Sequence, residues 1–166
     1  MATARRLAGP ILGIDPGLAA TGYAFLREDL SVAACGCIRT APGPDGARLL
    51  EIVRRLGEVM EVQPAAEAAL EELFMGRNRS SALGVAQARG ALLAFLEERG
   101  LRVFEYKPSL VKQLLTGYGM ADKAQLGRML SLQVRGSLDG LDEHAADAIA
   151  VALCHVRSRP ITAGTR

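Results

Sequence analysis

The apolar run ILGID at residues 11–15 limits the fold most strongly, because it ends on a carboxylate that turn-forming residues follow at once. Pro16 and Gly17 interrupt any regular element, so residues 16–20 are predicted to form a turn. Residues 21–26 then predict a returning strand, and residues 32–38 a third. The first forty residues are therefore expected to form a three-stranded meander.

The length and composition of the chain suit one domain. It has 166 residues, of which 49% are hydrophobic, enough for one good core but too few for two ordinary domains. We expect a single domain at residues 1–157 and a flexible tail at 158–166. No apolar stretch approaches the roughly 20 residues of a membrane span, and the start lacks the apolar segment of a secretion signal. We therefore expect a soluble, cytoplasmic protein.

The rest of the chain alternates helices with short strands, which indicates an α/β fold. Apolar residues recur at helical spacing up to about residue 62, after a Pro/Gly loop at 40–47. The segment 65–74 is ambiguous, because its Ala, Glu and Leu residues favour a helix whereas its isolation by Pro64 and its length suit a strand. The remaining predicted elements are a helix at 80–99, a strand at 101–106, and helices at 108–115, 122–134 and 144–157.

Asp15 needs a partner, because a carboxylate at the end of a buried strand is costly unless something compensates it. On local grounds a plain Asp-Pro-Gly turn is the favoured interpretation. The functional alternative is a divalent-cation ligand, with Gly17 and Gly22 leaving room for a phosphate. That alternative requires further ligands, and the candidates are Glu71 or Glu72 in the ambiguous segment, and His144 and Asp147, which share one helix face.

The three lysines of the chain are confined to one short region. Net charge is only +2, from 20 basic and 18 acidic side chains, so overall electrostatics does not indicate a nucleic-acid partner. Lys107, Lys112 and Lys123 nevertheless fall within one 17-residue stretch. This cluster is a candidate anion site, and a solvated surface is the alternative.

Four blocks of the sequence resemble the RuvC family of bacterial Holliday-junction resolvases over nearly the whole chain. They are GIDPGLAATGYA, ALEELFMGRNRSSALGVAQARGALLA, VFEYKPSLVKQLLTGYGMADKAQLGRML and HAADAIAVALCH. The resemblance implies a ribonuclease-H-like fold, in which a five-stranded mixed sheet, a three-strand meander then two parallel strands, has helices on both faces. It also implies that ALEEL is a strand beside the first one, with Glu72 facing outward.

The resemblance implies a metal site formed by Asp15, Glu71, His144 and Asp147. Many relatives carry Asp where this chain has His144, and a nitrogen ligand suits Mn²⁺ better than Mg²⁺. The implied reaction is hydrolysis of DNA by two metal ions per subunit, about 3.5–4 Å apart. Two symmetric nicks with 5′-phosphate and 3′-hydroxyl ends would then resolve a four-way junction in recombination and repair.

The resemblance also implies DNA contacts. Lys112 and Lys123 match basic positions near the cut strand, and Lys107 is a weaker candidate. After the Glu71 strand, Phe74 is expected to stack on a base at the opened junction while nearby residues hold the backbone; the alternative for Phe74 is a core position. The implied backbone contacts are Arg77, Asn78 and Arg79.

The helix at 80–99 is apolar on more than one side, so we expect it to form a two-fold homodimer contact; burial within one subunit is the alternative. The RuvA–RuvB branch-migration complex is a further partner that the resemblance implies. Three other functions remain open at this point. They are a ribonuclease-H-like nuclease acting on RNA, an actin-like ATPase lobe, and a junction-binding dimer with weak catalysis.

Overall fold

The computed structural model describes residues 9–73 and 79–162, with side chains described except at 79–81 and 160–162. Five strands form one sheet in the order β3-β2-β1-β4-β5. The strands are β1 (Ile11–Asp15), β2 (Ala20–Leu26), β3 (Val32–Arg39), β4 (Glu67–Glu71) and β5 (Val103–Tyr106). The helices are α1 (Asp45–Val62), α2 (Arg79–Glu98), α3 (Pro108–Thr116), α4 (Lys123–Gln133) and α5 (Glu143–Thr162).

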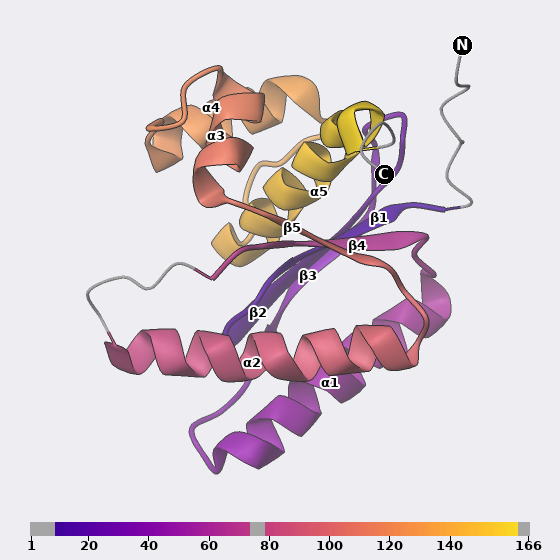
Figure 1. Ribbon diagram of the computed structural model, residues 1–166, viewed down its shortest axis with the longest axis vertical. Coiled ribbons are helices and arrows are strands. Elements are labelled where there is room, and N and C mark those ends of the chain that lie inside the picture. The colour runs from indigo at the N-terminus through magenta and orange to yellow at the C-terminus, as the bar shows by residue number, and fades with distance from the viewer. Residues whose placement is uncertain (1–8, 74–78, 163–166) are drawn as a thin grey trace.

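Helices cover both faces of the sheet, as Figure 1 shows, with α1 and α2 on one side and α3, α4 and α5 on the other. Two hydrophobic cores result. Leu12 and Ile14 of β1 face the α1 and α2 side, whereas Ile11 faces α5. The sheet is mixed, because β1, β2 and β3 pair antiparallel and β1, β4 and β5 pair parallel. The expected architecture is confirmed.

The ambiguous segment is a strand, because tertiary pairing prevails over helix propensity. Ala68 and Leu70 pack into the core on the α1 and α2 side, and Ala69 packs into the core under α5. Glu67 and Glu71 alternate with the first pair and therefore share the α5 face. Glu72 follows the strand and is exposed, as expected.

Helix α5 lies unusually close to the sheet because two strand residues have no side chain. A Cβ at Gly13 would lie 2.0 Å from the carbonyl oxygen of Ala148, and one at Gly22 would lie 1.9 Å from that of His144. Small helix residues, among them Ala145 and Ala148, are fully buried at this contact. The glycines of β1 and β2 therefore allow the helix to pack directly on the backbone.

Two predicted boundaries are wrong. The flexible tail expected from residue 158 is helical through Thr162, because Ser158 is buried and donates its hydroxyl to the carbonyl of Cys154, and Arg159 pairs with Glu67 and Glu28. Helix α1 also begins earlier than expected, at Asp45, inside the predicted loop.

The ends of α4 and α2 lie close to those of the predicted helices at 122–134 and 80–99. Asp122 caps α4 and forms a reciprocal capping box with Gln125, and Gly100 follows α2 with a φ of +70°. Within the described residues no helix is both long and apolar enough to cross a membrane.

Candidate active site

Asp15 and Glu71 lie side by side at the carboxyl ends of two neighbouring parallel strands. The register pairs Ile14 of β1 with Leu70 of β4, so the next residue of each strand emerges at the same edge of the sheet. Ile14 and Leu70 face α1 and α2, and strand alternation therefore directs both carboxylates toward α5. Two acids distant in sequence are thus brought to one place by the pairing of their strands.

The first two turns of α5 add His144 and Asp147 to these two acids. The His144 Nδ1 atom lies 2.8 Å from Oδ2 of Asp15, and both side chains are about one third exposed. The close packing of α5 on Gly22 sets this distance. Asp147 comes one helical turn later and faces the same way. All four expected site residues, Asp15, Glu71, His144 and Asp147, lie at this edge of the sheet.

The start of α5 is itself fixed by a residue that the sequence did not single out. Asp142 Oδ1 accepts a hydrogen bond from the backbone N–H of His144 at 2.9 Å. Its Oδ2 accepts one from the Arg39 guanidinium at 2.5 Å, so β3 and α5 are joined here. Asp142 therefore holds the backbone of His144 and is itself held by Arg39 of β3.

The carboxylates repel one another and are partly desolvated. Burial, and then the charges of Asp15 and Asp147, raise the pKa of Glu71 to about 7. Burial also raises the pKa of Asp15, although its hydrogen bond to His144 opposes the shift, and it raises the pKa of Asp147 against the attraction of Lys123. A concentration of poorly compensated negative charge is therefore present at this edge.

Two of the three lysines reach this cluster. The Lys123 ammonium pairs with Glu143 and lies 3.4 Å from Oδ2 of Asp147. The charge of Lys112 acts on Glu71 and lowers its pKa. Lys107 is exposed at the start of α3, where it is the N-cap residue, and none of the pKa shifts in the cluster involves it.

The donor set suits a divalent cation in chemistry and charge. Carboxylate oxygens with one imidazole nitrogen are ligands that Mg²⁺ and Mn²⁺ accept, and a cation would relieve the repulsion that raises the pKa of Glu71. The donors do not yet converge, however: among the described residues no three His, Cys, Asp or Glu side chains are grouped closely enough to hold an ion. Asp15 is instead bonded to His144, and Asp147 to Lys123.

Several expected DNA contacts lie outside the part of the chain that the structure describes. These are Phe74, Arg77 and Asn78. Arg79 is the first residue of α2, but its side chain is likewise outside that part.

Two glycines near Asp15 have another role than the one expected from the sequence. Gly22 was expected to leave room for a phosphate, whereas the space beside it is occupied by the carbonyl of His144. A Cβ at Gly17 would lie 2.3 Å from the carbonyl oxygen of Ala20, so this glycine serves the tight turn. Gly22 therefore allows α5 to pack against β2, and Gly17 allows the tight turn after Asp15.

Arg89 on α2 contacts the Glu71 strand end and was not among the expected site residues. Its guanidinium donates to the carbonyl oxygen of Glu71 at 2.8 Å and pairs with Glu105. The available signal was a lone cation at the centre of a helix of mostly small and apolar residues.

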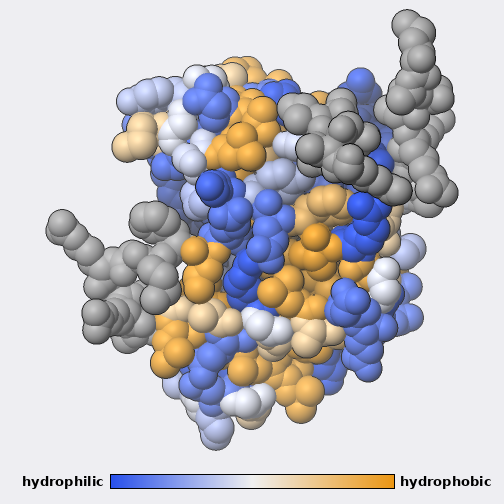
Figure 2. Space-filling model, in the orientation of Figure 1, coloured by the Kyte–Doolittle hydropathy of each residue, from blue (hydrophilic) through white to orange (hydrophobic). Residues whose placement is uncertain are grey.

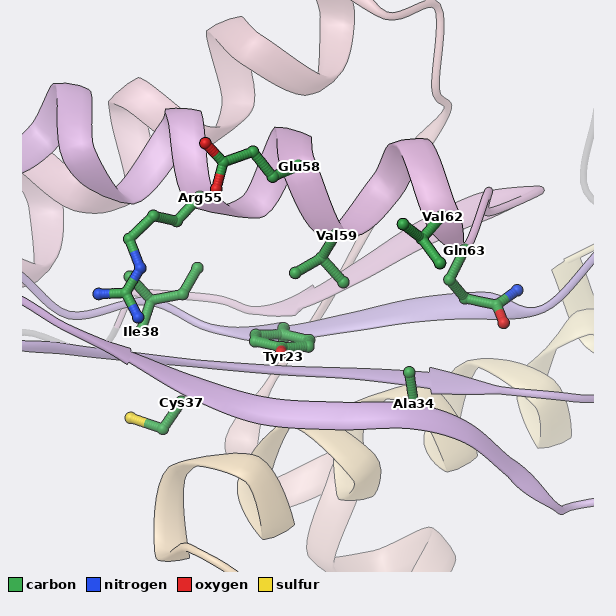
Figure 3. A pocket seen from close by; sticks show the side chains of 9 residues that line it. All are labelled: Tyr23, Ala34, Cys37, Ile38, Arg55, Glu58, Val59, Val62 and Gln63. Carbon is green, nitrogen blue, oxygen red and sulfur yellow. The ribbon is translucent and has the colours of Figure 1, made fainter.

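A hollow that the described residues form lies on the other side of the sheet. It has a volume of about 470 Å³ and is open to solvent between α1 and the strands β2 and β3. Figure 3 shows Val59 of α1 pointing toward Tyr23 of the sheet across this hollow. None of the four acidic-cluster residues lines it, so we assign the chemistry to the cluster and not to the hollow.

Known proteins resemble this chain over nearly all of its length. The family model for "Crossover junction endodeoxyribonuclease RuvC" matches residues 11–155. The curated protein of that name from Roseiflexus sp. is 43% identical over 154 residues, covering 90% of this chain and 92% of the relative. The one from Chloroflexus aggregans is 41% identical over 153 residues, covering 90% and 93%.

Solved structures agree with the sequence relatives. The structure described as T. thermophilus RuvC in complex with Holliday junction substrate matches with a TM-score of 0.85 at 31% identity. The match covers 93% of this chain and 97% of that one, which confirms the ribonuclease-H-like fold implied by the sequence. Strands, acidic cluster and relatives thus agree, and the chain belongs to the RuvC family of crossover junction endodeoxyribonucleases.

Proposed function

We propose that this chain resolves four-way DNA junctions with the acidic cluster at the ends of β1 and β4 as its catalytic centre. The proposed metal ligands are Asp15, Glu71, His144 and Asp147. One observation carries the proposal: the strand register places Asp15 and Glu71 side by side, and the α5 residue His144 reaches Asp15 at 2.8 Å, so residues of three separate segments bring metal-ligand side chains to one edge. The raised pKa of Glu71 agrees with this crowding of acids. Membership of the family supports the reaction, because RuvC-family nucleases use divalent metal ions.

Each residue has a distinct part in the proposed site. Two divalent ions per subunit would activate the attacking water and stabilise the leaving oxygen in line with it. Asp15 lies between the Glu71 strand and the α5 turn and is therefore the proposed shared ligand. His144 already bonds Asp15 and orients its carboxylate, and Asp147 lies beyond it on the same face.

The lysines beside the cluster are proposed to bind the cut strand. Lys123 pairs with Glu143 and Asp147, and a phosphate oxygen offers its ammonium a comparable partner. Lys112 lies near enough to Glu71 to influence its pKa. Lys107, more exposed, would contribute to the same basic surface. The segment after β4 would supply further contacts to the opened junction, from Phe74, Arg77, Asn78 and Arg79.

Helix α2 is the proposed homodimer contact. It buries Ala88, Leu92 and Leu96 inward, yet its outer face carries a stripe formed by Leu83, Gly90, Ala94 and Glu97. The Leu83 side chain is 62% exposed, and apolar patches are visible on the surface facing the viewer in Figure 2. The small residues Gly90 and Ala94 on this face would let a second helix approach closely, and a two-fold dimer would present two identical sites to a junction. The RuvA–RuvB complex as a partner and a cytoplasmic location stay predictions from the family.

His144 motivates a specific proposal about the metal. Compared with an aspartate, it removes one negative charge and offers nitrogen, so we expect faster cleavage with Mn²⁺ than with Mg²⁺. The variant His144→Asp should shift the preference toward Mg²⁺. Cleavage rates that are equal in the two ions, before and after this change, would contradict the proposal.

The experiment for the site compares cleavage and binding of a synthetic four-way junction. Asp15→Asn, Glu71→Gln and Asp147→Asn should each abolish metal-dependent nicking and leave junction binding intact, because each keeps the shape of the side chain and removes its charge. The exposed Glu72, next to Glu71, supplies the matched control Glu72→Gln, which should cleave like the wild type. Normal cleavage by any one of the first three variants would remove that residue from the proposed ligand set.

A further inference from the structure

Arg89 holds the backbone of Glu71 from the opposite face of the sheet. Its Nη1 donates to the Glu71 carbonyl oxygen at 2.8 Å, and its Nη2 lies 2.5 Å from Oε1 of Glu105 on β5. The Arg89 side chain is only 12% exposed, whereas that of Glu105 is 40% exposed. One planar guanidinium thus joins α2 to the ends of β4 and β5 at once.

The end of β4 needs such a partner because its strand pairing is one-sided there. The β1–β4 register ends at Ile14 and Leu70, while the β4–β5 register continues to Glu71 and Tyr106. The N–H of the following residue, Glu72, donates to the Tyr106 carbonyl at 2.8 Å. Glu71 is therefore secured by β5 on one side, and Arg89 supplies the additional hydrogen bond to its carbonyl.

We infer that Arg89 is a positioning residue, which fixes the Glu71 backbone so that the carboxylate is presented to the metal ions. This inference rests on the proposed function, in which Glu71 is a metal ligand. A hydrogen bond to the main-chain carbonyl of a ligand residue restrains where its side chain starts. Partners bonded directly to ligand side chains change metal affinity by about 10- to 100-fold when they are removed, and we take the lower end of that range for this main-chain contact. Arg89 touches neither substrate nor metal in this role.

Lysine cannot replace arginine here. Its single ammonium lacks the fork that reaches the Glu71 carbonyl and the Glu105 carboxylate together. Arg89→Lys should therefore show part of the effect, and Arg89→Gln all of it. Glu105→Gln retains an acceptor oxygen for the guanidinium and should have the smallest effect.

The test measures Mn²⁺ binding by calorimetry on the full-length protein, and the Mn²⁺ concentration that gives half-maximal junction cleavage. Arg89→Gln should weaken Mn²⁺ binding and raise the half-maximal concentration by about tenfold. Junction binding without metal should stay within about twofold of wild type. Amide exchange at Glu72, whose N–H bonds Tyr106, should become faster in the same variant, as a loosened strand end requires.

A control arginine lies just after the far end of α2. Arg99 pairs with Glu61 of α1 at 2.7 Å and stacks on Phe95 of α2. Arg99→Gln removes an arginine–glutamate ion pair without touching β4, so its Mn²⁺ affinity should equal that of the wild type.

Different results would overturn the role of Arg89 and the proposed metal ligands. Mn²⁺ affinity in folded Arg89→Gln that matches Arg99→Gln within about twofold overturns the positioning role, and Arg89→Lys decides by the same criterion if Arg89→Gln does not fold. If Glu71→Gln cleaves the junction as the wild type does, the proposed ligand set is overturned instead. The inference about Arg89 and the proposal about the site therefore fail by different results.

Discussion

Replacing Gly22 with alanine should disable the site without altering any proposed ligand. A Cβ at this position would lie 1.9 Å from the His144 carbonyl oxygen and 2.3 Å from its carbonyl carbon. Gly22 has no positive φ, so alanine brings no backbone strain of its own. The whole effect should come from contact with the first turn of α5.

The size of the effect follows from the distance. Contacts below 3.0 Å are essentially never made by a Cβ, so the separation of 1.9 Å must grow by at least 1.1 Å. His144 Nδ1 is 2.8 Å from Asp15, and a shift of that size breaks this bond. Misplacement by about 1 Å reduces catalysis by about 100-fold, or about 2.7 kcal/mol in the barrier. Overpacking should also lower the free energy of unfolding by about 1–3 kcal/mol.

Single-turnover cleavage of a four-way junction measures the first effect, and urea unfolding the second. Gly46→Ala is the control, because a Cβ at Gly46 in α1 would meet nothing within 4 Å. It should cleave at the wild-type rate. If Gly22→Ala cleaves within threefold of wild type, then close packing of α5 on β2 does not set the geometry of the site.

Three further predictions concern stability. Glu71 binds a proton more tightly in the folded protein, where its pKa is about 7 against the ordinary 4.5, so the metal-free protein should lose stability as pH rises from about 4.5 to 7. In urea unfolding at several pH values, Glu71→Gln should flatten this dependence of the free energy of unfolding on pH. An unchanged dependence would count against the raised pKa of Glu71. Tyr106→Phe removes the hydroxyl that lies 2.5 Å from Nδ1 of the fully buried His155, and it should lower the free energy of unfolding, measured in urea, by about 1–3 kcal/mol. A loss below about 0.5 kcal/mol would be inconsistent with that hydrogen bond. Asp122→Ala removes the cap of α4 and should lower the free energy of unfolding by about 1 kcal/mol, whereas Asp122→Asn keeps the cap. Equal melting temperatures for the two variants would refute the capping role.

Most of the fold follows from the sequence alone where local signals and tertiary context agree. The buried run at residues 11–15, the Asp122 cap and the Gly100 end of α2 all have a direct physical cause in neighbouring residues. The strand at 67–71 does not, because its residues favour a helix and only pairing with β1 and β5 decides the matter. The helical turn at residues 158–162 depends on Glu67, which is distant in sequence.

The candidate site divides in the same way. Residue type and helical spacing identify His144 and Asp147 as neighbours, and the strand ends bring Asp15 and Glu71 together. The roles of Gly22 and Arg89 depend on which element lies across the sheet, and a single sequence carries no record of that. The salt bridges of Lys123 likewise appear only when α4 and α5 are placed side by side.

The cluster at the ends of β1 and β4 is proposed to cut junctions with the help of metal ions. The most direct measurement is cleavage of a synthetic four-way junction by wild type and Asp15→Asn, with and without Mn²⁺, beside linear duplex and DNA/RNA hybrid of the same sequence. We expect nicking of the junction alone, only with metal and only by the wild type. Cleavage by Asp15→Asn at the wild-type rate, or a preference for the hybrid over the junction, would contradict it.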